Sequence, residues 1–251
     1  MTKRVYEKYD GSQVTDSMLQ EAARLFSENY GVWGREAASV VGAFAKEGNH
    51  VKISKDRLRA QYLPENAVCS YVRVIVDGHL AGNAFACRWK YENRTVCWIT
   101  QLVVHRNYRE RGLAVGLLNE LKESEDDVYG LMSSHPAACI AAARVFGNTI
   151  NAVRLDFIKE HAEGIMKSSP ISYVRAARPH GSLFNSGNTD GAVSSVDTNF
   201  FIDHTEPLEA LASVRETMDW PLGELLDGHE YLIVFEVRHR SRSTSRPRPG
   251  S

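Results

Sequence analysis

The stretch Trp98-Ile-Thr-Gln-Leu-Val-Val-His-Arg-Asn-Tyr-Arg-Glu-Arg-Gly-Leu-Ala-Val-Gly-Leu-Leu118 decides the fold, because it leads an apolar strand through a basic turn into a helix. Residues 96–104 are apolar enough for a central strand that is covered on both faces. The N–H groups of the first helical turn lack intrahelical partners, and together with the helix dipole they favour a phosphate. The sequence therefore predicts an anion-binding turn at the end of a central strand.

The turn Arg109-Glu-Arg-Gly112-Leu-Ala114 combines positive charge with a glycine, which lets the backbone curve closely around a ligand. Neither the GxGxxG dinucleotide fingerprint nor a P-loop is present. The pattern resembles the Arg/Gln-x-x-Gly-x-Gly/Ala pyrophosphate loop of the GNAT superfamily of acyl-CoA-dependent N-acyltransferases. His105-Arg-Asn-Tyr108 stands where that family often has His-Pro-x-Tyr. The alternative interpretation is a basic, solvated turn.

The rest of the chain predicts a mixed α/β (α+β) fold. Strands are expected at 5–9, 68–76, 80–89, 96–104, 128–132 and 230–237, with a hairpin turn at Asp77-Gly78. Helices are expected at 16–26, 113–123, 136–146, 156–168 and 207–217. The GNAT resemblance implies a central, mostly antiparallel sheet that is flanked by helices and splayed between strands four and five.

One domain is predicted for residues 1–237, with an acceptor-side insertion at about 170–204 and a turn-rich stretch within it. Residues 238–251 form a basic, Ser- and Pro-rich tail without apolar periodicity, which predicts disorder. We expect a solvated tail rather than one that contacts a nucleic acid or a kinase. Oligomeric state is not predicted.

Composition is that of a globular protein, with 43% hydrophobic and 24% charged residues in 251. A net charge of -1 argues against a nucleic-acid partner. No signal peptide or membrane-spanning run is present, so we expect a protein without membrane contact in the cytoplasm, with the nucleus as the alternative. The four cysteines show no CxxC pair, which predicts reduced, buried thiols and no metal site.

The resemblance implies acetyl-CoA as the acyl donor. Main-chain groups at the end of the central strand would bind the pantetheine amides as an added strand, and the turn would bind the pyrophosphate. The predicted cofactor-binding residues are Leu102, Val103, Val104, Arg109, Glu110, Arg111, Gly112, Leu113 and Ala114. The backbone N–H of Val104 or a neighbour is the candidate oxyanion donor.

The catalytic groups depart from the family pattern. Family members carry a Glu or His on the active-site face of strand four, where alternation places Trp98 and Thr100. Pro136 and Ala143 occupy the places of the usual Asn and of the Tyr that protonates the leaving thiolate. His135 is the candidate base and Ser134 the candidate proton donor, each weighed against a surface role next to a helix. Cys139 is interpreted as a packed thiol.

Acceptor selection is assigned to the aromatic, glycine-containing segment 29–35 and to residues 178–204. Asp203 and His204 could engage an amine there, although core-edge packing is favoured. The sequence predicts an N-acetyltransferase, an acyltransferase that moves acetyl from acetyl-CoA to a primary amine of a small molecule. The alternatives are a protein or peptide N-acetyltransferase and a non-catalytic acyl-CoA-binding regulator.

Overall fold

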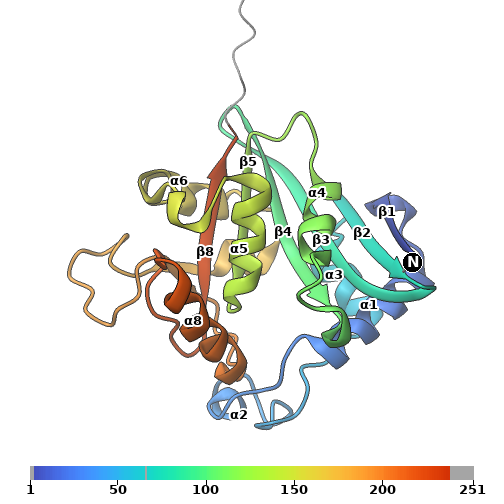
Figure 1. The fold of residues 1–251 in the computed structure, drawn as a ribbon, viewed down its shortest axis with the longest axis horizontal. Helices are drawn as coiled ribbons and strands as arrows, with labels where there is room; N and C mark the ends of the chain where they lie inside the picture. The colour runs from blue at the N-terminus through green and yellow to red at the C-terminus, as the bar shows by residue number, and fades with distance from the viewer. Residues whose placement is uncertain (1–2, 66, 238–251) are drawn as a thin grey trace, which may run out of the picture.

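The computed structural model describes residues 3–65 and 67–237, and its strands form one eight-stranded sheet (Figure 1). The strands lie in the order β1-β2-β3-β4-β5-β8-β7-β6. Their bounds are β1 Arg4–Asp10, β2 Val68–Val76, β3 His79–Tyr91, β4 Arg94–Val104, β5 Val128–Ser133, β6 Arg178–His180, β7 Ser195–Asp197 and β8 His229–Glu236. The sheet is antiparallel except between β4 and β5, which are parallel.

Helices cover both faces of the sheet (Figure 1). The α-helices are α1 Asp16–Asn29, α2 Ala37–Val40, α3 Lys55–Tyr62, α4 Leu113–Leu121, α5 Pro136–Phe146, α6 Leu155–Lys167, α7 Ser172–Ala176 and α8 Thr205–Thr217. Helices α4 and α5 pack together on one face, where α4 contacts β2 and β3 while α5 contacts β5 and β8. Helices α1 and α3 pack on the opposite face, over β3 and β4.

The predicted fold class is confirmed, and the strands and helices expected from the sequence form within a few residues of their predicted bounds. Three helices and two short strands were not expected, namely α2, α3, α7, β6 and β7. Helix α3 shows no clear apolar periodicity, because it is mostly polar and buries only Leu58 and Tyr62. Strand β8 is the last in sequence, yet it lies inside the sheet, between β5 and β7.

Strand β4 contains a bulge that reshapes its second half. Phe85 of β3 faces Gln101 while the next residue, Ala86, faces Ile99, so Thr100 is the extra residue. The strict alternation assumed from the sequence is wrong at this point, because one inserted residue reverses the face of every residue after it. Gln101, rather than Thr100, therefore continues the face that carries Trp98.

The parallel pairing of β4 with β5 is short, which opens the sheet. It runs from Val96 with Val128 to Ile99 with Leu131, whereas β4 continues to Val104. Beyond Ile99 the two strands therefore separate, as the predicted splay requires. Gly130 in β5 has space only because it lacks a side chain, since a Cβ there would collide with the ring of the buried Trp98.

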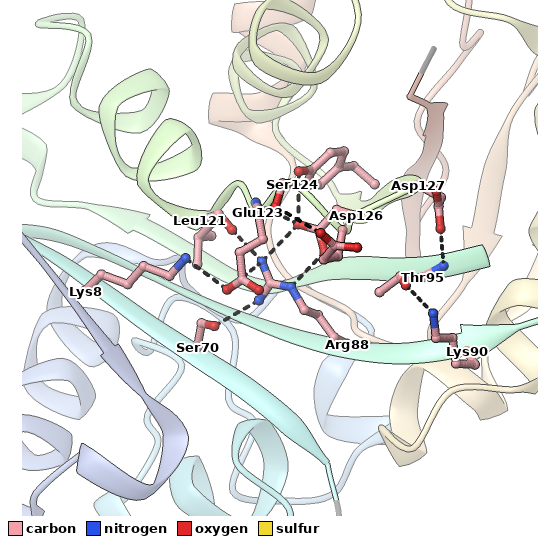
Figure 2. A network of polar contacts seen from close by, with 12 residues as sticks. Lys8, Ser70, Arg88, Lys90, Thr95, Leu121, Glu123, Ser124, Asp126 and Asp127 are labelled. Atoms are coloured by element: carbon pink, nitrogen blue, oxygen red, sulfur yellow. Dashed lines mark hydrogen bonds and ion pairs between the residues drawn. The ribbon is translucent and has the colours of Figure 1, made fainter. Parts of the chain in front are cut away.

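A buried ion pair connects β3 to the loop that follows α4 (Figure 2). Arg88 Nε donates to Asp126 Oδ1 at 2.8 Å, and Arg88 Nη1 donates to the Ser70 hydroxyl at 2.9 Å. Tyr129 and the Glu123 N–H also donate to Asp126 Oδ2, each at 3.0 Å. The network holds the loop that leads from α4 into β5, on the side of the sheet away from α1.

The predicted tail, 238–251, lies outside the described residues. In the part of the chain that the structure describes, no helix combines the length and apolarity needed to cross a bilayer.

Candidate active site

A groove of about 960 Å³ lies where β4 and β5 separate, bordered by the first turns of α4 and α5. Of the residues predicted to bind the cofactor, all but Arg111 line it. The main chain of Arg111 is held from outside the groove, because its carbonyl accepts a hydrogen bond from Arg4 Nη1 at 3.1 Å. Its guanidinium lies 5.5 Å from the centre of the Tyr108 ring.

The turn at 109–114 has the backbone that the anion-site prediction requires. Glu110 and Gly112 both adopt left-handed conformations, with φ of 61° and 76°. Gly112 is the N-cap of α4, and a Cβ built on it would meet nothing within 4 Å. The space in front of this helix N-terminus is therefore open, and the unpaired first-turn N–H groups can reach a phosphate there.

The exposed edge of β4 also suits an extended amide ligand. The His105 N–H donates to Ala81 O at 2.9 Å, toward β3. Successive peptide groups of a strand point to opposite sides, so the N–H groups of Val104 and Leu102 point into the gap beside β5. The position of Arg109 agrees, since its Nε donates to Val104 O from the groove side at 3.4 Å. These residues fit the pantetheine arm of acyl-CoA.

Arg109 is already paired with protein groups. Its Nη2 donates to Asn29 O at 2.7 Å, and its Nη1 pairs with the carboxylate of Glu206, in the first turn of α8. Glu206 Oε1 also lies 3.7 Å from His135 Nε2. An acidic side chain thus stands in the groove beside the arginine that was predicted to face the phosphates.

Ser134 and His135 line this groove at the start of α5. His135 is the N-cap of α5, and its Nδ1 accepts the Ala137 N–H at 3.2 Å, so a proton on the neutral ring is carried by Nε2. Burial lowers the pKa of His135, while the charge of Glu206 opposes that shift. At neutral pH the ring is therefore mainly neutral. Ser134 is buried.

A second cavity, of about 760 Å³, lies on the face of the sheet that carries Trp98. Segment 29–35 contributes Tyr30 and Trp33 to it, and segment 178–204 contributes Thr198, Asn199 and Phe200. The cavity and the groove meet, because they share the lining residues Tyr30, His50, Leu102, Ser133 and Ala138. Val103 and Val104 line the groove alone, so Leu102 is the strand residue at the junction.

Glu230 lines this second cavity, and the sequence did not predict it as a site residue. Strand β8 pairs with β5 up to Tyr231 opposite Ser133, so Glu230 lies just past the end of β5. Burial raises the pKa of its carboxyl group to about 7, and the neighbouring Thr198 side chain opposes the shift. Glu230 is the first residue of the apolar strand predicted at 230–237, where a charged residue is typical of a strand end. No sequence motif indicates that it belongs to a site.

Three tyrosines surround this carboxyl group in the cavity wall. Burial raises the pKa of Tyr62 to about 12 and those of Tyr30 and Tyr173 well above the usual value, and Glu230 adds to each shift. The Tyr173 hydroxyl donates to Thr100 O, at the β4 bulge, at 2.8 Å. All three phenols are therefore protonated at neutral pH and can donate hydrogen bonds.

The remaining candidates lie apart from this cavity. His204 is buried at the start of α8, 3.9 Å from Asp227, and the Asp203 carboxylate accepts the Thr205 N–H. Cys139 is buried in α5, and burial raises its pKa. Within residues 3–65 and 67–237, no group of three or more His, Cys, Asp or Glu side chains is arranged to hold a metal ion.

A splayed parallel pair, a helix N-terminus at its open end and an adjoining cavity together define a GNAT-like fold. The sequence pattern of the Acetyltransferase (GNAT) family matches residues 22–133, from within α1 to the end of β5. Residues 22–133 thus resemble the GNAT family in sequence, and the resemblance drawn from the turn at 109–114 is confirmed. The match includes the groove-forming strand and turn but ends before Tyr173 and Glu230.

No curated protein matches the sequence. Among solved structures, a tandem GNAT protein from the clavulanic acid biosynthesis pathway is 13% identical, with a TM-score of 0.39 over 57% of this chain and 43% of that chain. An aminoglycoside acetyltransferase from an uncultured soil metagenomic sample is 16% identical, with a TM-score of 0.36 over 52% and 80%. The ribosomal-protein-S18-alanine N-acetyltransferase of Escherichia coli is 16% identical, with a TM-score of 0.36 over 57% and 77%.

Proposed function

We propose that the protein is an N-acetyltransferase that moves the acetyl group of acetyl-CoA to a primary amine of a small molecule by direct attack. The observation that carries the proposal is the junction of the two cavities at Tyr30, Leu102 and Ser133. The groove has the backbone geometry for an anionic, amide-containing donor, and the second cavity holds a carboxyl group with a pKa of about 7. When bound, acetyl-CoA supplies the thioester carbonyl at this junction.

The groove residues would bind and orient the donor. First-turn N–H groups of α4 bind the pyrophosphate, and the N–H group of Val104 donates to the pantetheine arm. Ala138 and Ala141 of α5 line the same groove and leave room for the arm. Because Leu102 lies at the junction, we assign its N–H, rather than that of Val104, as the donor that stabilises the developing oxyanion.

Glu230 is proposed as the general base. An aliphatic ammonium must lose a proton before its nitrogen can attack, and a carboxylate with a pKa near 7 is well matched to this transfer at neutral pH. The nitrogen then forms a bond to the carbonyl carbon as the C–S bond breaks. The nitrogen loses one proton before it attacks and a second as the amide forms. This second loss balances the proton that the leaving thiolate gains.

Tyr30 is proposed as the group that protonates the thiolate, in place of the tyrosine that Ala143 replaces. It lies at the junction, and its raised pKa keeps the phenol protonated. His135 and Ser134, which line the groove, are the second candidates for this proton transfer. We expect Tyr30→Phe to lower kcat more than Tyr62→Phe, which lies away from the junction; a loss only in His135→Ala would transfer the role to His135.

The proposal is tested by thiol release from acetyl-CoA with a panel of amines. Glu230→Gln should lower kcat/KM by about 10²- to 10⁴-fold and abolish the rise of kcat/KM through pH 7. Glu216→Gln, on the exposed side of α8, is the matched control and should behave as the wild type. Binding of acetyl-CoA without thiol release on any amine would contradict the proposal and favour the regulator.

The small-molecule acceptor is tested separately from the transfer chemistry. Deletion of residues 238–251 should leave thiol release unchanged, since the proposed sites lie within residues 26–230. Loss of acceptor binding on deletion would favour a macromolecular substrate.

A further inference from the structure

We propose, resting on the function above, that the acceptor is a monoamine carried on an aromatic or other flat apolar body, and that polycations are excluded. The second cavity is lined by one buried carboxyl group, by aromatic rings and by two exposed basic residues.

The aromatic wall consists of residues from three separate segments. Trp33 packs edge-on against Phe200 at a ring-centre distance of 5.6 Å and against Phe44 at 6.2 Å. Tyr30 lies 6.0 Å from Phe200 and stacks on Phe26 at 4.3 Å. Phe44 is 65% exposed, so most of its ring remains accessible to a ligand. Rings arranged this way offer faces and edges to another ring, and such ring contacts stabilise a complex beyond burial alone.

The charges of the cavity fit one ammonium group. Among the described residues that line it, Glu230 is the only acidic one. Lys52 and Arg57 line the same cavity, are exposed, and form no ion pair within residues 3–65 and 67–237. A second ammonium on the acceptor would lose water without gaining a carboxylate, and it would approach two like charges.

Two buried polar side chains indicate where the acceptor accepts or donates hydrogen bonds. The Thr100 hydroxyl and the Gln101 amide line the cavity, are 8% and 4% exposed as residues, and have no hydrogen-bond partner within the described ranges. Gln101 lies against the Tyr62 hydroxyl without reaching hydrogen-bond geometry. Unpaired buried polar groups are unfavourable, so a ligand or water that pairs with them is favoured.

The experiment compares kcat/KM for 2-phenylethylamine, n-hexylamine, spermidine and kanamycin, measured as thiol release from acetyl-CoA. We expect 2-phenylethylamine to exceed n-hexylamine by at least about tenfold, and both polycations to fall at least about 100-fold below it. Phe200→Leu should raise KM for 2-phenylethylamine several-fold, with little change in its kcat or in KM for n-hexylamine.

Charge reversal tests the entrance directly. The double variant Lys52→Glu, Arg57→Glu should raise kcat/KM for spermidine by about tenfold or more. The control, Arg35→Glu, Lys46→Glu, makes the same change in net charge at exposed residues that do not line the cavity, so it corrects for long-range attraction. We expect the control to give a much smaller gain.

The outcomes separate this inference from the proposed function. Faster turnover of spermidine or kanamycin than of 2-phenylethylamine overturns the inference and leaves N-acetyl transfer intact. Equal kcat/KM for the aromatic and linear monoamines, unchanged in Phe200→Leu, also overturns it. Thiol release with none of the four amines contradicts the proposed function and the inference with it.

Discussion

Glu230 combines burial with a titratable group, so it links the acceptor cavity to the stability of the fold. Its pKa rises from 4.5 to about 7 because the cavity wall removes water from the carboxylate. Between these two values the folded protein binds more protons than the unfolded chain, and stability therefore falls as pH rises. The stabilising, protonated form is fully present below pH 4.5 and is lost as pH rises through about 7.

Replacing this carboxyl group should remove that pH dependence. We expect Glu230→Gln to be about as stable as the wild type at pH 5 and more stable at pH 8, by up to about 3 kcal/mol. Urea unfolding at the two pH values measures the difference, and Glu216→Gln corrects for a general change of charge. An equal effect of Glu230→Gln at both pH values would show that the carboxyl pKa is not raised.

At the scale of single residues, the sequence revealed the groove better than the acceptor cavity. Gly112 and its basic neighbours are adjacent in the chain, so a local motif contains the whole turn. Tyr30 and Glu230 lie 200 positions apart and meet only because β8 inserts beside β5. Local patterns carry no information about such a contact. The sequence predicts that β8 is a strand, but it does not show which strands lie beside it.

At the scale of elements, the proposed pyrophosphate site in the turn before α4 can be tested at Gly112, with Gly78 as a closely matched control. Gly112 and Gly78 both have positive φ, of 76° and 85°, and both have open space where a Cβ would lie. Valine at either position should cost about 1–2 kcal/mol of stability, because left-handed backbone disfavours β-branched residues. Only Gly112→Val should also abolish acetyl-CoA binding, since its side chain fills the space in front of the helix N-terminus.

Calorimetric titration with CoA, together with a melting curve for each variant, measures both effects. Retained CoA affinity in a folded Gly112→Val protein would contradict the proposed pyrophosphate site. Equal loss of affinity in Gly78→Val, in the β2–β3 hairpin, would show that the effect arises from destabilisation.

The first turn of α8 supplies the acidic side chain that neutralises Arg109. CoA bound in this groove as proposed would bring negative charge next to Glu206, which would repel it and compete with it for the arginine. We expect Glu206→Gln to tighten CoA binding by about 1 kcal/mol, or about fivefold, with a smaller gain at high salt. Glu209→Gln is the control, because Glu209 lines the groove but does not pair with Arg109.

Weaker CoA binding in Glu206→Gln than in Glu209→Gln would instead show that Glu206 positions Arg109 productively. The comparison of Kd values at low and high salt distinguishes this positioning effect from charge repulsion.

The elements that the sequence predicts are those that depend on local features of the chain. Hairpin β2–β3 and the segment from β4 to α4 follow from Asp77-Gly78, alternation and leucine spacing, which are local features. The bulge at Thr100 depends on how β3 and β4 pair, and alternation within β4 cannot show it. It nevertheless decides that Gln101 faces the acceptor cavity.

At the scale of the whole molecule, the charged network around Arg88 connects three strands and the end of α4 (Figure 2). Arg88 and Asp126 have side chains that are only 5% and 0% exposed, and their interaction raises the pKa of Arg88 above its usual range. A buried ion pair adds little stability relative to apolar packing. Removing one partner is costly, because the other charge stays in a site without water.

We therefore expect Asp126→Asn to lower the free energy of unfolding by about 3 kcal/mol or more. Glu123→Gln is the matched control: Glu123 lies 3.4 Å from the same guanidinium but is 40% exposed, so its loss should cost about 1 kcal/mol or less. Urea unfolding at pH 7 measures both losses of stability. The CoA affinity of the folded variants should match that of the wild type, because the network lies at the C-terminal end of α4 whereas Gly112 lies at its N-terminus. Equal losses of stability in the two variants would show that Asp126 does not carry the buried charge of Arg88, and a parallel loss of CoA affinity would show that α4 transmits the disturbance along its length.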